Sequence, residues 1–188
     1  MLPRAAELVA KALQVRATDC RPVAGGDVAR AWQVTLADGR EVFAKTLPGA
    51  PPTLFPTEAA GLRRLRQAPG GVPVPAVLAA DADLLVLEWV PAGAPDVAAA
   101  EALGCRLAAT HGSLPPGTPF GNLAGAADRP GAAGVADGMG FLGPLPLPAG
   151  TGTRWGPWWV EHRVLPYARL ARDRGNLSPS DAADVDAV

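Results

Sequence analysis

Lys45 is the residue of this chain whose type and position are best suited to a chemical role. The chain has 17 basic residues, but Lys11 and Lys45 are its only lysines. Lys45 lies within an apolar, alternating run at residues 42–47, which predicts a β-strand. A lysine ammonium is a compact charge on a flexible stem and can make a point contact with phosphate. Because arginine is the default basic residue here, we interpret Lys45 as a candidate phosphate contact.

Glu58 is the candidate partner of that lysine. A helix is predicted over residues 54–67, with Thr53 as its N-cap and Pro56 in the first turn. Spacings of three and four place several residues on one apolar helix face, namely Glu58, Gly61, Leu62 and Leu65. A half-buried ammonium needs such a carboxylate, and removal of one partner of a buried pair costs ~3–5 kcal/mol. The alternative is a solvated lysine on an edge strand and an unrelated helix glutamate.

Two further segments fit nucleotide binding when they are read in chain order. Gly25 and Gly26 form a turn between strands, where the backbone can approach phosphates and offer N–H donors. The apolar run at 84–90 ends in a Pro/Gly connector, so the backbone from Glu88 to Val90 could meet an adenine edge. Taken singly, the first segment is an ordinary turn and the second an ordinary strand end.

The pattern along the chain predicts an α+β fold. A helix at 5–14 is followed by strands at 22–26, 32–36, 41–47, 76–80 and 84–89, with an Asp-Gly hairpin turn at 38–39. We expect residues 1–90 to form a five-stranded antiparallel sheet with one helix on it. Residues 91–188 then form a hinge and a partial helical lobe. Helices are predicted at 96–111, with Leu103 and Leu107 inward, at 157–174, and from 178 onward, and 115–156 is an irregular linker.

Composition limits the classes of function. With 48% apolar residues and a net charge of −1, the chain can form a core and has no nucleic-acid footprint. Cys20 and Cys105 lack metal-ligand spacing and are expected to be reduced thiols. No apolar run is long enough for a membrane span, and the N-terminus predicts an amphipathic helix rather than a secretory signal. We therefore expect a cytoplasmic protein, of unknown oligomeric state.

Residues for phosphoryl transfer itself are not recognisable. That reaction needs an acid near the acceptor hydroxyl and Asp or Asn ligands for Mg²⁺. His111-Gly112-Ser113 has Ser113 where an aspartate is needed, so we interpret His111 as a helix-end residue. Asp137 lies in the irregular stretch and is declined as a metal ligand. His162, in a Trp-rich helix, is interpreted as a packing or surface residue.

The order of these segments resembles the fructosamine kinase (ketosamine-3-kinase) family, relatives of the aminoglycoside phosphotransferases. The matching segments are GGDVARAW at 25–32, VFAK at 42–45, TEAAGLRRL at 57–65, VPAV at 74–77 and LVLEWV at 85–90. WGPWWVEHRVLP at 155–166 is the most family-specific, and Asp173-Arg174-Gly175 also fits. Many family members carry a cysteine where this chain has Asp27, so a redox switch at that position is not expected.

The resemblance implies a kinase-like fold that uses ATP and Mg²⁺ to phosphorylate a sugar hydroxyl of a ketosamine, a glycated amine, and so to repair it. Lys45 would contact the phosphates, Glu58 would orient Lys45, Gly25 and Gly26 would cover them, and residues 88–90 would meet adenine. The helix at 155–163 would form one wall of the acceptor cleft. The family's catalytic aspartate and metal ligand are expected beyond Val188, so we assign no catalytic or metal residue here. The alternatives are a non-catalytic nucleotide-binding or interaction fragment, an aminoglycoside- or choline-type kinase, and a structural domain without a ligand.

Overall fold

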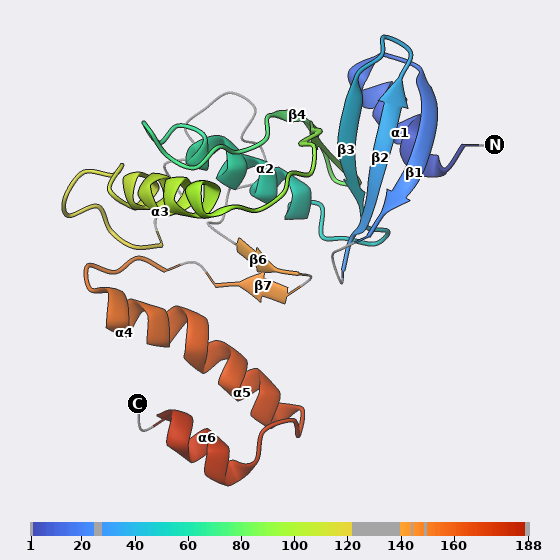
Figure 1. Cartoon of the computed structure of the whole chain (residues 1–188). Helices are drawn as coiled ribbons and strands as arrows, with labels where there is room; N and C mark the ends of the chain where they lie inside the picture. Colours follow the sequence, from blue (N-terminus) through green and yellow to red (C-terminus); the bar gives the residue numbers. More distant parts are fainter. Residues whose placement is uncertain (1, 25–27, 122–139, 144, 149, 187–188) are drawn as a thin grey trace.

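The computed structural model describes residues 2–24, 28–121, 140–143, 145–148 and 150–186, and it has an α+β fold (Figure 1). A five-stranded sheet with two helices is followed by a longer helix, a small hairpin and a series of helices. The first elements are α1 (Arg4–Leu13), β1 (Ala17–Val23), β2 (Arg30–Leu36), β3 (Glu41–Thr46), α2 (Leu54–Leu65), β4 (Val77–Ala80), β5 (Leu84–Glu88) and α3 (Val97–His111). The predicted fold class is confirmed.

The strand β3 is the central strand of the sheet. The strands follow the order β1-β2-β3-β5-β4, and every neighbouring pair is antiparallel. The predicted β2–β3 hairpin turn is present: Gly39 has a φ of 85°, and the Asp38 Oδ1 atom accepts a hydrogen bond from the Arg40 N–H at 3.1 Å. A hydrogen bond from the Arg40 side chain lowers the pKa of Asp38. Because β3 pairs with a strand on each side, Lys45 lies on an interior strand and not on an edge.

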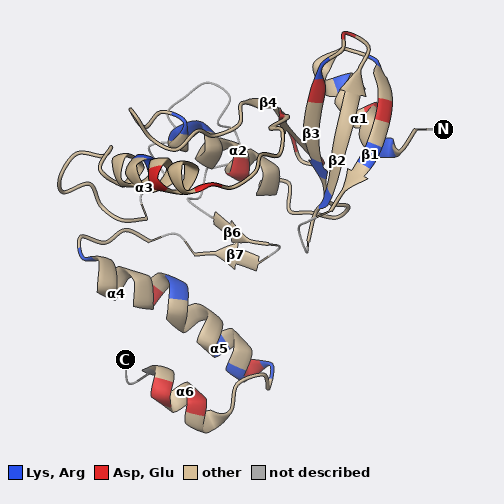
Figure 2. Cartoon of the chain, viewed as in Figure 1, with Lys and Arg blue, Asp and Glu red and all other residues tan. Residues whose placement is uncertain are grey.

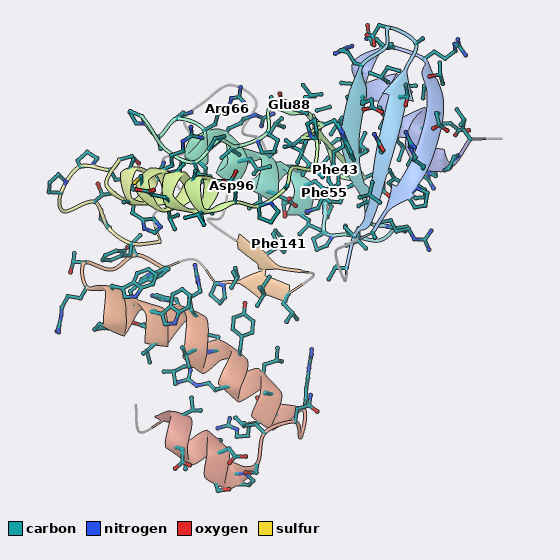
Figure 3. The ribbon with its side chains drawn as sticks, viewed as in Figure 1. Phe43, Phe55, Arg66, Glu88, Asp96 and Phe141 are labelled. Atoms are coloured by element: carbon teal, nitrogen blue, oxygen red, sulfur yellow. The ribbon has the colours of Figure 1, made fainter. Side chains whose placement is uncertain are left out.

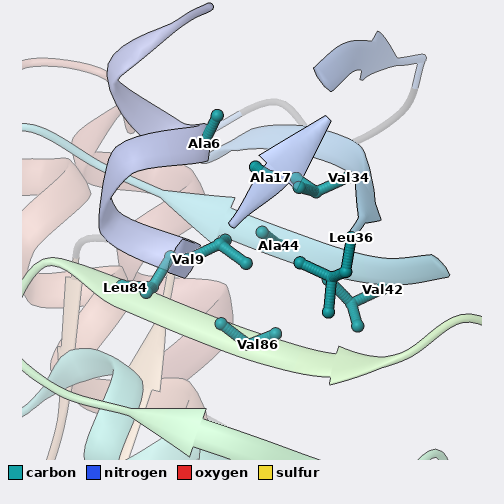
Figure 4. Packing of buried hydrophobic residues seen from close by; sticks show 9 residues of the cluster. All are labelled: Ala6, Val9, Ala17, Val34, Leu36, Val42, Ala44, Leu84 and Val86. Carbon is teal, nitrogen blue, oxygen red and sulfur yellow. The ribbon is translucent and has the colours of Figure 1, made fainter. Parts of the chain in front are cut away.

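One face of the sheet packs against α1. The apolar side chains of this core belong to α1 and to alternate positions of the strands, and they are Ala6, Val9, Ala17, Val34, Leu36, Val42, Ala44, Leu84 and Val86 (Figure 4). Successive strand residues point to opposite faces, so Val42 and Ala44 on β3 leave Phe43 and Lys45 on the other face. The alternation at residues 42–47 therefore gives β3 one face toward α1 and one face that carries Lys45.

The opposite face of the sheet packs against α2. Its core consists of Leu54, Phe55 and Ala59 from the helix and Leu85 and Leu87 from β5. Because β5 is apolar at consecutive positions, both faces of the sheet must be covered. The sheet therefore carries a helix on each face, rather than the one helix predicted.

Three local predictions around these elements are wrong. The first strand runs from Ala17 to Val23 rather than 22–26, with a register irregularity near its start. Thr53 does not cap α2, because its φ of −90° and ψ of −7° are already helical, whereas a cap residue is extended. The inner face of α2 is centred on Phe55 and Ala59, while Leu65 is 47% exposed. Leu62 packs against this core as predicted, whereas Gly61 and Leu65 are exposed.

The helix α3 begins as predicted but does not bury the predicted residues. The Asp96 Oδ1 atom accepts a hydrogen bond from the Ala99 N–H at 2.6 Å and caps the helix. Leu103 and Leu107 are 53% and 45% exposed, so the prediction that they point inward is wrong. Spacing identifies the apolar side of a helix, but it does not show whether another element covers that side.

The second half of the described chain contains a hairpin and several helical segments. They are β6 (Gly140–Leu142), β7 (Leu145–Leu147), α4 (Trp155–Trp159), the π-helical turn η2 (Val160–Val164), α5 (Leu165–Asp173) and α6 (Pro179–Asp186). The prediction of an irregular linker was wrong at β6 and β7. The helix predicted at 157–174 contains the π-turn just before Pro166, whose ring nitrogen cannot donate a hydrogen bond to the preceding turn.

Charged residues of both signs are interspersed along the chain (Figure 2). Over the described residues, no helix has the length and apolar character that crossing a membrane requires. Both cysteines are free, with Cys20 partly buried and Cys105 exposed. Burial raises the pKa of the Cys20 thiol, which disfavours the reactive thiolate.

Candidate functional site

The structure brings Lys45 and Glu58 together. The Lys45 Nζ atom donates a hydrogen bond to the Glu58 Oε1 atom at 2.7 Å. Lys45 projects from the β3 face that α2 covers, and Glu58 lies on α2 beside the buried Ala59. The pairing of β3 with β5 places Lys45 opposite Leu85, which is fully buried. Strand alternation and helix phase together therefore orient the two charges toward each other.

The Lys45–Glu58 ion pair is only partly shielded from solvent. The two side chains are 31% and 35% exposed. Ion pairs with this much access to water contribute about 0–1 kcal/mol to stability, well below the ~3–5 kcal/mol expected for a fully buried pair. The stability that such a pair contributes is too small to explain why a lysine occupies the central strand. Its partial exposure leaves the ammonium accessible to an anionic ligand.

A cavity of about 590 Å³ lies beside this ion pair. Its walls come from the β1 and β2 ends, β3, the first turns of α2 and the β6–β7 hairpin. The lining residues are Val23, Ala24, Val28, Ala29, Ala31, Phe43, Lys45, Leu47, Leu54, Phe55, Thr57, Glu58, Phe141 and Gly143. Figure 3 labels Phe43, Phe55 and Phe141, which come from three different elements around it. Among the described lining residues, most are apolar and the charged ones are the paired Lys45 and Glu58. Such a cavity suits a ligand with an apolar body and a group that can bind the remaining N–H donors of the ammonium.

The described residues on either side of the predicted glycine turn line this cavity. Gly25 and Gly26 lie outside the described residues, so their predicted role is stated only for the sequence. Ala24 precedes them, Val28 follows them, and both line the cavity.

Glu88 and Val90 lie outside the cavity beside Lys45. The Glu88 N–H donates to the Ala76 carbonyl at 2.9 Å, and the Glu88 Oε2 atom accepts from the Ala76 N–H at 3.0 Å. Arg66 lies 3.8 Å from the same carboxylate, so Glu88 ties the connector before β4 to β5. Val90 is 61% exposed, and neither residue lines the cavity beside Lys45. Their contact with adenine stays a prediction.

The Trp-rich helix forms a separate aromatic cluster. Trp155 stacks on Trp159 with ring centroids 5.0 Å apart, and the Trp158 Nε1–H donates to the Gly150 carbonyl at 2.7 Å. Arg163 lies over the Trp158 ring at 4.6 Å. Packing within this cluster therefore accounts for the tryptophan, glycine and arginine residues at these positions. The helix does not line the cavity that contains Lys45. His162 packs against Trp158, as expected of a packing residue.

No metal site is visible over the described part of the chain. No group of three or more His, Cys, Asp or Glu side chains could hold an ion there. His111 ends α3 at the exposed surface. Asp137, which we declined as a metal ligand, lies outside the described residues.

Of the residues that line the cavity, the sequence identified only Lys45 and Glu58 as site residues. Thr57, Phe141 and Gly143 are among those it missed. Phe141 lies in a strand of three residues, which is too short for alternation to reveal. Gly143 is one of many turn glycines in its region. Thr57 precedes Glu58, and only the position of the hairpin and the helix phase show that it lines the cavity.

Thr57 supports a prediction about stability. Its Oγ1 atom is buried without a hydrogen-bond partner among the described residues. A buried unsatisfied hydroxyl costs about 1–3 kcal/mol, so Thr57→Val is expected to raise the free energy of unfolding by roughly 1 kcal/mol. Urea denaturation measures this change.

The matched control for Thr57→Val is Thr110→Val. The Thr110 Oγ1 atom accepts a hydrogen bond from the Val72 N–H at 3.0 Å, so removal of this hydroxyl is expected to lower stability. Shifts of the same sign in both variants would contradict the assignment of Thr57 as unsatisfied.

Comparison with known proteins adds an independent observation. The family model described as fructosamine kinase matches residues 1–187. Among solved structures, the chain is similar to a "putative fructosamine-3-kinase" from Thermobifida fusca YX-ER1, with a TM-score of 0.75 and 31% sequence identity. The match covers 95% of this chain and 57% of that chain, so this chain spans little more than half the length of the solved relative. No curated protein matches. Since the family model extends over nearly the whole sequence, this chain belongs to the fructosamine kinase family.

Proposed function

We propose that this chain forms the ATP-binding part of a small-molecule kinase that phosphorylates a sugar hydroxyl of ketosamines. The observation that carries the proposal is the accessible Lys45 ammonium, held at 2.7 Å by Glu58 on the wall of a cavity of about 590 Å³. Membership of the fructosamine kinase family supports the same chemistry. In the proposed arrangement, residues 1–90 bind the nucleotide and residues 91–188 begin the second lobe of a cytoplasmic enzyme.

The residues of the cavity fit an ATP phosphate group. Lys45 offers a cation with spare N–H donors, because an ammonium has three and Glu58 accepts one of them. Bound ATP would supply the phosphoryl group, and Mg²⁺ would neutralise its charge. Among the described residues, no group of three or more His, Cys, Asp or Glu side chains could hold the ion.

Each chain residue has a distinct proposed task. Lys45 binds the phosphates, and Glu58 holds the Lys45 side chain in the direction that reaches them. The turn at Gly25 and Gly26 covers the phosphates with its backbone N–H groups. Residues from Glu88 to Val90 contact the adenine edge. The apolar walls around Phe43 exclude water and so strengthen the contact between the ammonium and the phosphate.

Calorimetric titration with Mg-ATP tests the proposal. We expect saturable binding and an increase in melting temperature, since a ligand of the folded state stabilises it by mass action. A panel of ketosamines, aminoglycosides and choline, each incubated with ATP, then measures phosphoryl transfer. Absence of ATP binding contradicts the whole proposal. Binding without turnover on any acceptor restricts the chain to nucleotide binding, and turnover on aminoglycosides alone contradicts the ketosamine assignment.

A further inference from the structure

The β6–β7 hairpin contacts the nucleotide-binding half of the fold from a distant part of the sequence. Phe141, on β6, packs against the core cluster that contains Phe55 and Leu54 of α2. It also lines the cavity beside Lys45 and Glu58. Figure 3 shows Phe141 on β6, which contacts α2, the helix that carries Phe55. Phe141, about 80 residues from Glu58 in the sequence, therefore packs against α2, the helix that carries Glu58.

The turn of the same hairpin reaches the other side of the cavity. Gly143 has a φ of 59°, which favours glycine. A Cβ atom added there would lie 3.1 Å from the Val28 Cγ2 atom, so the hairpin backbone lies directly against the residue that follows the glycine turn. The hairpin thus spans the cavity from α2 to the start of β2.

We propose that Phe141 is a positioning residue that holds α2 so that Glu58 keeps Lys45 aimed into the cavity. The inference rests on the proposed function, because its readout is nucleotide binding. It concerns an apolar residue from a distant hairpin, and it makes the nucleotide pocket depend on the β6–β7 hairpin.

The physical reason is the relative strength of the contacts on α2. The Lys45–Glu58 pair is about one-third exposed and therefore weak. It cannot by itself hold a helix whose apolar face has lost a neighbour. The inner face of α2 is held by Phe55 and Ala59 against β5, and the cavity side of its first turns is held by Phe141. Loss of the Phe141 ring leaves those turns free to move away from β3, and the carboxylate moves with them.

The neighbouring residue provides a matched control. Leu142 lies on the same strand, but its side chain is 60% exposed and does not line the cavity. Phe141→Ala and Leu142→Ala therefore remove side chains of similar character from opposite faces of β6. Phe141→Leu keeps an apolar group at the position and tests rescue by a conservative change.

The experiment is a double-mutant cycle between Phe141 and Glu58, read out as the Kd for Mg-ATP in calorimetry. Phe141→Ala is expected to weaken binding about fivefold to tenfold in the wild-type background, as coupled neighbouring residues typically do. In the Glu58→Gln background, the same change is expected to weaken binding by less than about twofold, because its effect passes through Glu58. Phe141→Leu is expected to restore most of the affinity, and Leu142→Ala to stay within about twofold of wild type.

The outcomes separate this inference from the proposed function. Equal losses from Phe141→Ala in both backgrounds indicate a merely structural role and overturn the inference, as does unchanged affinity. If Phe141→Ala fails to fold, as judged by circular dichroism, the same cycle with Phe141→Val, which also removes the ring but suits a strand better, decides. ATP binding that depends on Lys45 but not on Phe141 leaves the proposed function standing and removes only this inference. Absence of ATP binding in the wild type overturns both.

Discussion

Lys45→Ala is expected to weaken ATP binding by about tenfold to a hundredfold without unfolding the protein. A charge-assisted hydrogen bond contributes roughly 1.5–3 kcal/mol, which corresponds to this range of affinity. The effect on stability is expected to be about 1 kcal/mol or less, because the pair that is lost is one-third exposed. Binding calorimetry measures the first quantity and urea denaturation the second.

The other lysine of the chain is the control for charge. Lys11 lies in the last turn of α1 and is exposed, so Lys11→Ala removes the same charge far from the cavity. We expect it to leave ATP affinity unchanged. Lys45→Arg keeps the charge but replaces a compact ammonium with a planar guanidinium, and we expect it to recover only part of the affinity. If wild type and Lys45→Ala bind ATP with equal affinity, Lys45 does not contact the phosphates.

Phe55→Ala is expected to have the largest effect on stability. Phe55 is 1% exposed and lies at the centre of the core between α2 and β5. Truncation of a buried phenylalanine to alanine costs about 3–5 kcal/mol, because contacts are lost and a cavity remains. This loss is a large fraction of the stability of a typical domain, which is about 5–15 kcal/mol. Chemical denaturation measures it as a shift of the midpoint at constant slope.

Leu65 on the same helix is the control for Phe55. Its side chain is 47% exposed, so Leu65→Ala is expected to change stability by less than about 0.5 kcal/mol. The two variants also test the phase of α2, since the sequence pattern predicted Leu65 on the inner face. A larger loss from Leu65→Ala than from Phe55→Ala would show that the helix is rotated relative to the structure.

Much of the sheet could be predicted from local patterns. Alternation in β2 and β3 separates two faces, and the Asp38-Gly39 turn joins them in one register, because strand geometry and turn chemistry act between near neighbours. The same alternation places Lys45 on the face with Phe43. The helix period places Glu58 close to the inner side of α2. Two short-range rules therefore led to the candidate ion pair.

Other features depended on contacts between distant residues. The pattern marked Leu103 and Leu107 as an apolar side of α3, yet no rule of spacing states whether a partner covers that side. The hairpin at 140–147 has strands of three residues each, too short to carry a periodic signal. Its stability comes from packing against α2, which no local window contains.

By itself, the amino-acid sequence determined the α+β class, the central position of a rare lysine in an apolar strand and the family of the chain. Only the tertiary structure decided that both faces of the sheet are covered, that Lys45 and Glu58 meet at 2.7 Å, and that Phe141 completes their cavity. The physical reason is the separation along the sequence over which each effect acts. Propensity and periodicity act over a few residues, whereas burial and pocket shape depend on side chains that only the folded chain brings together.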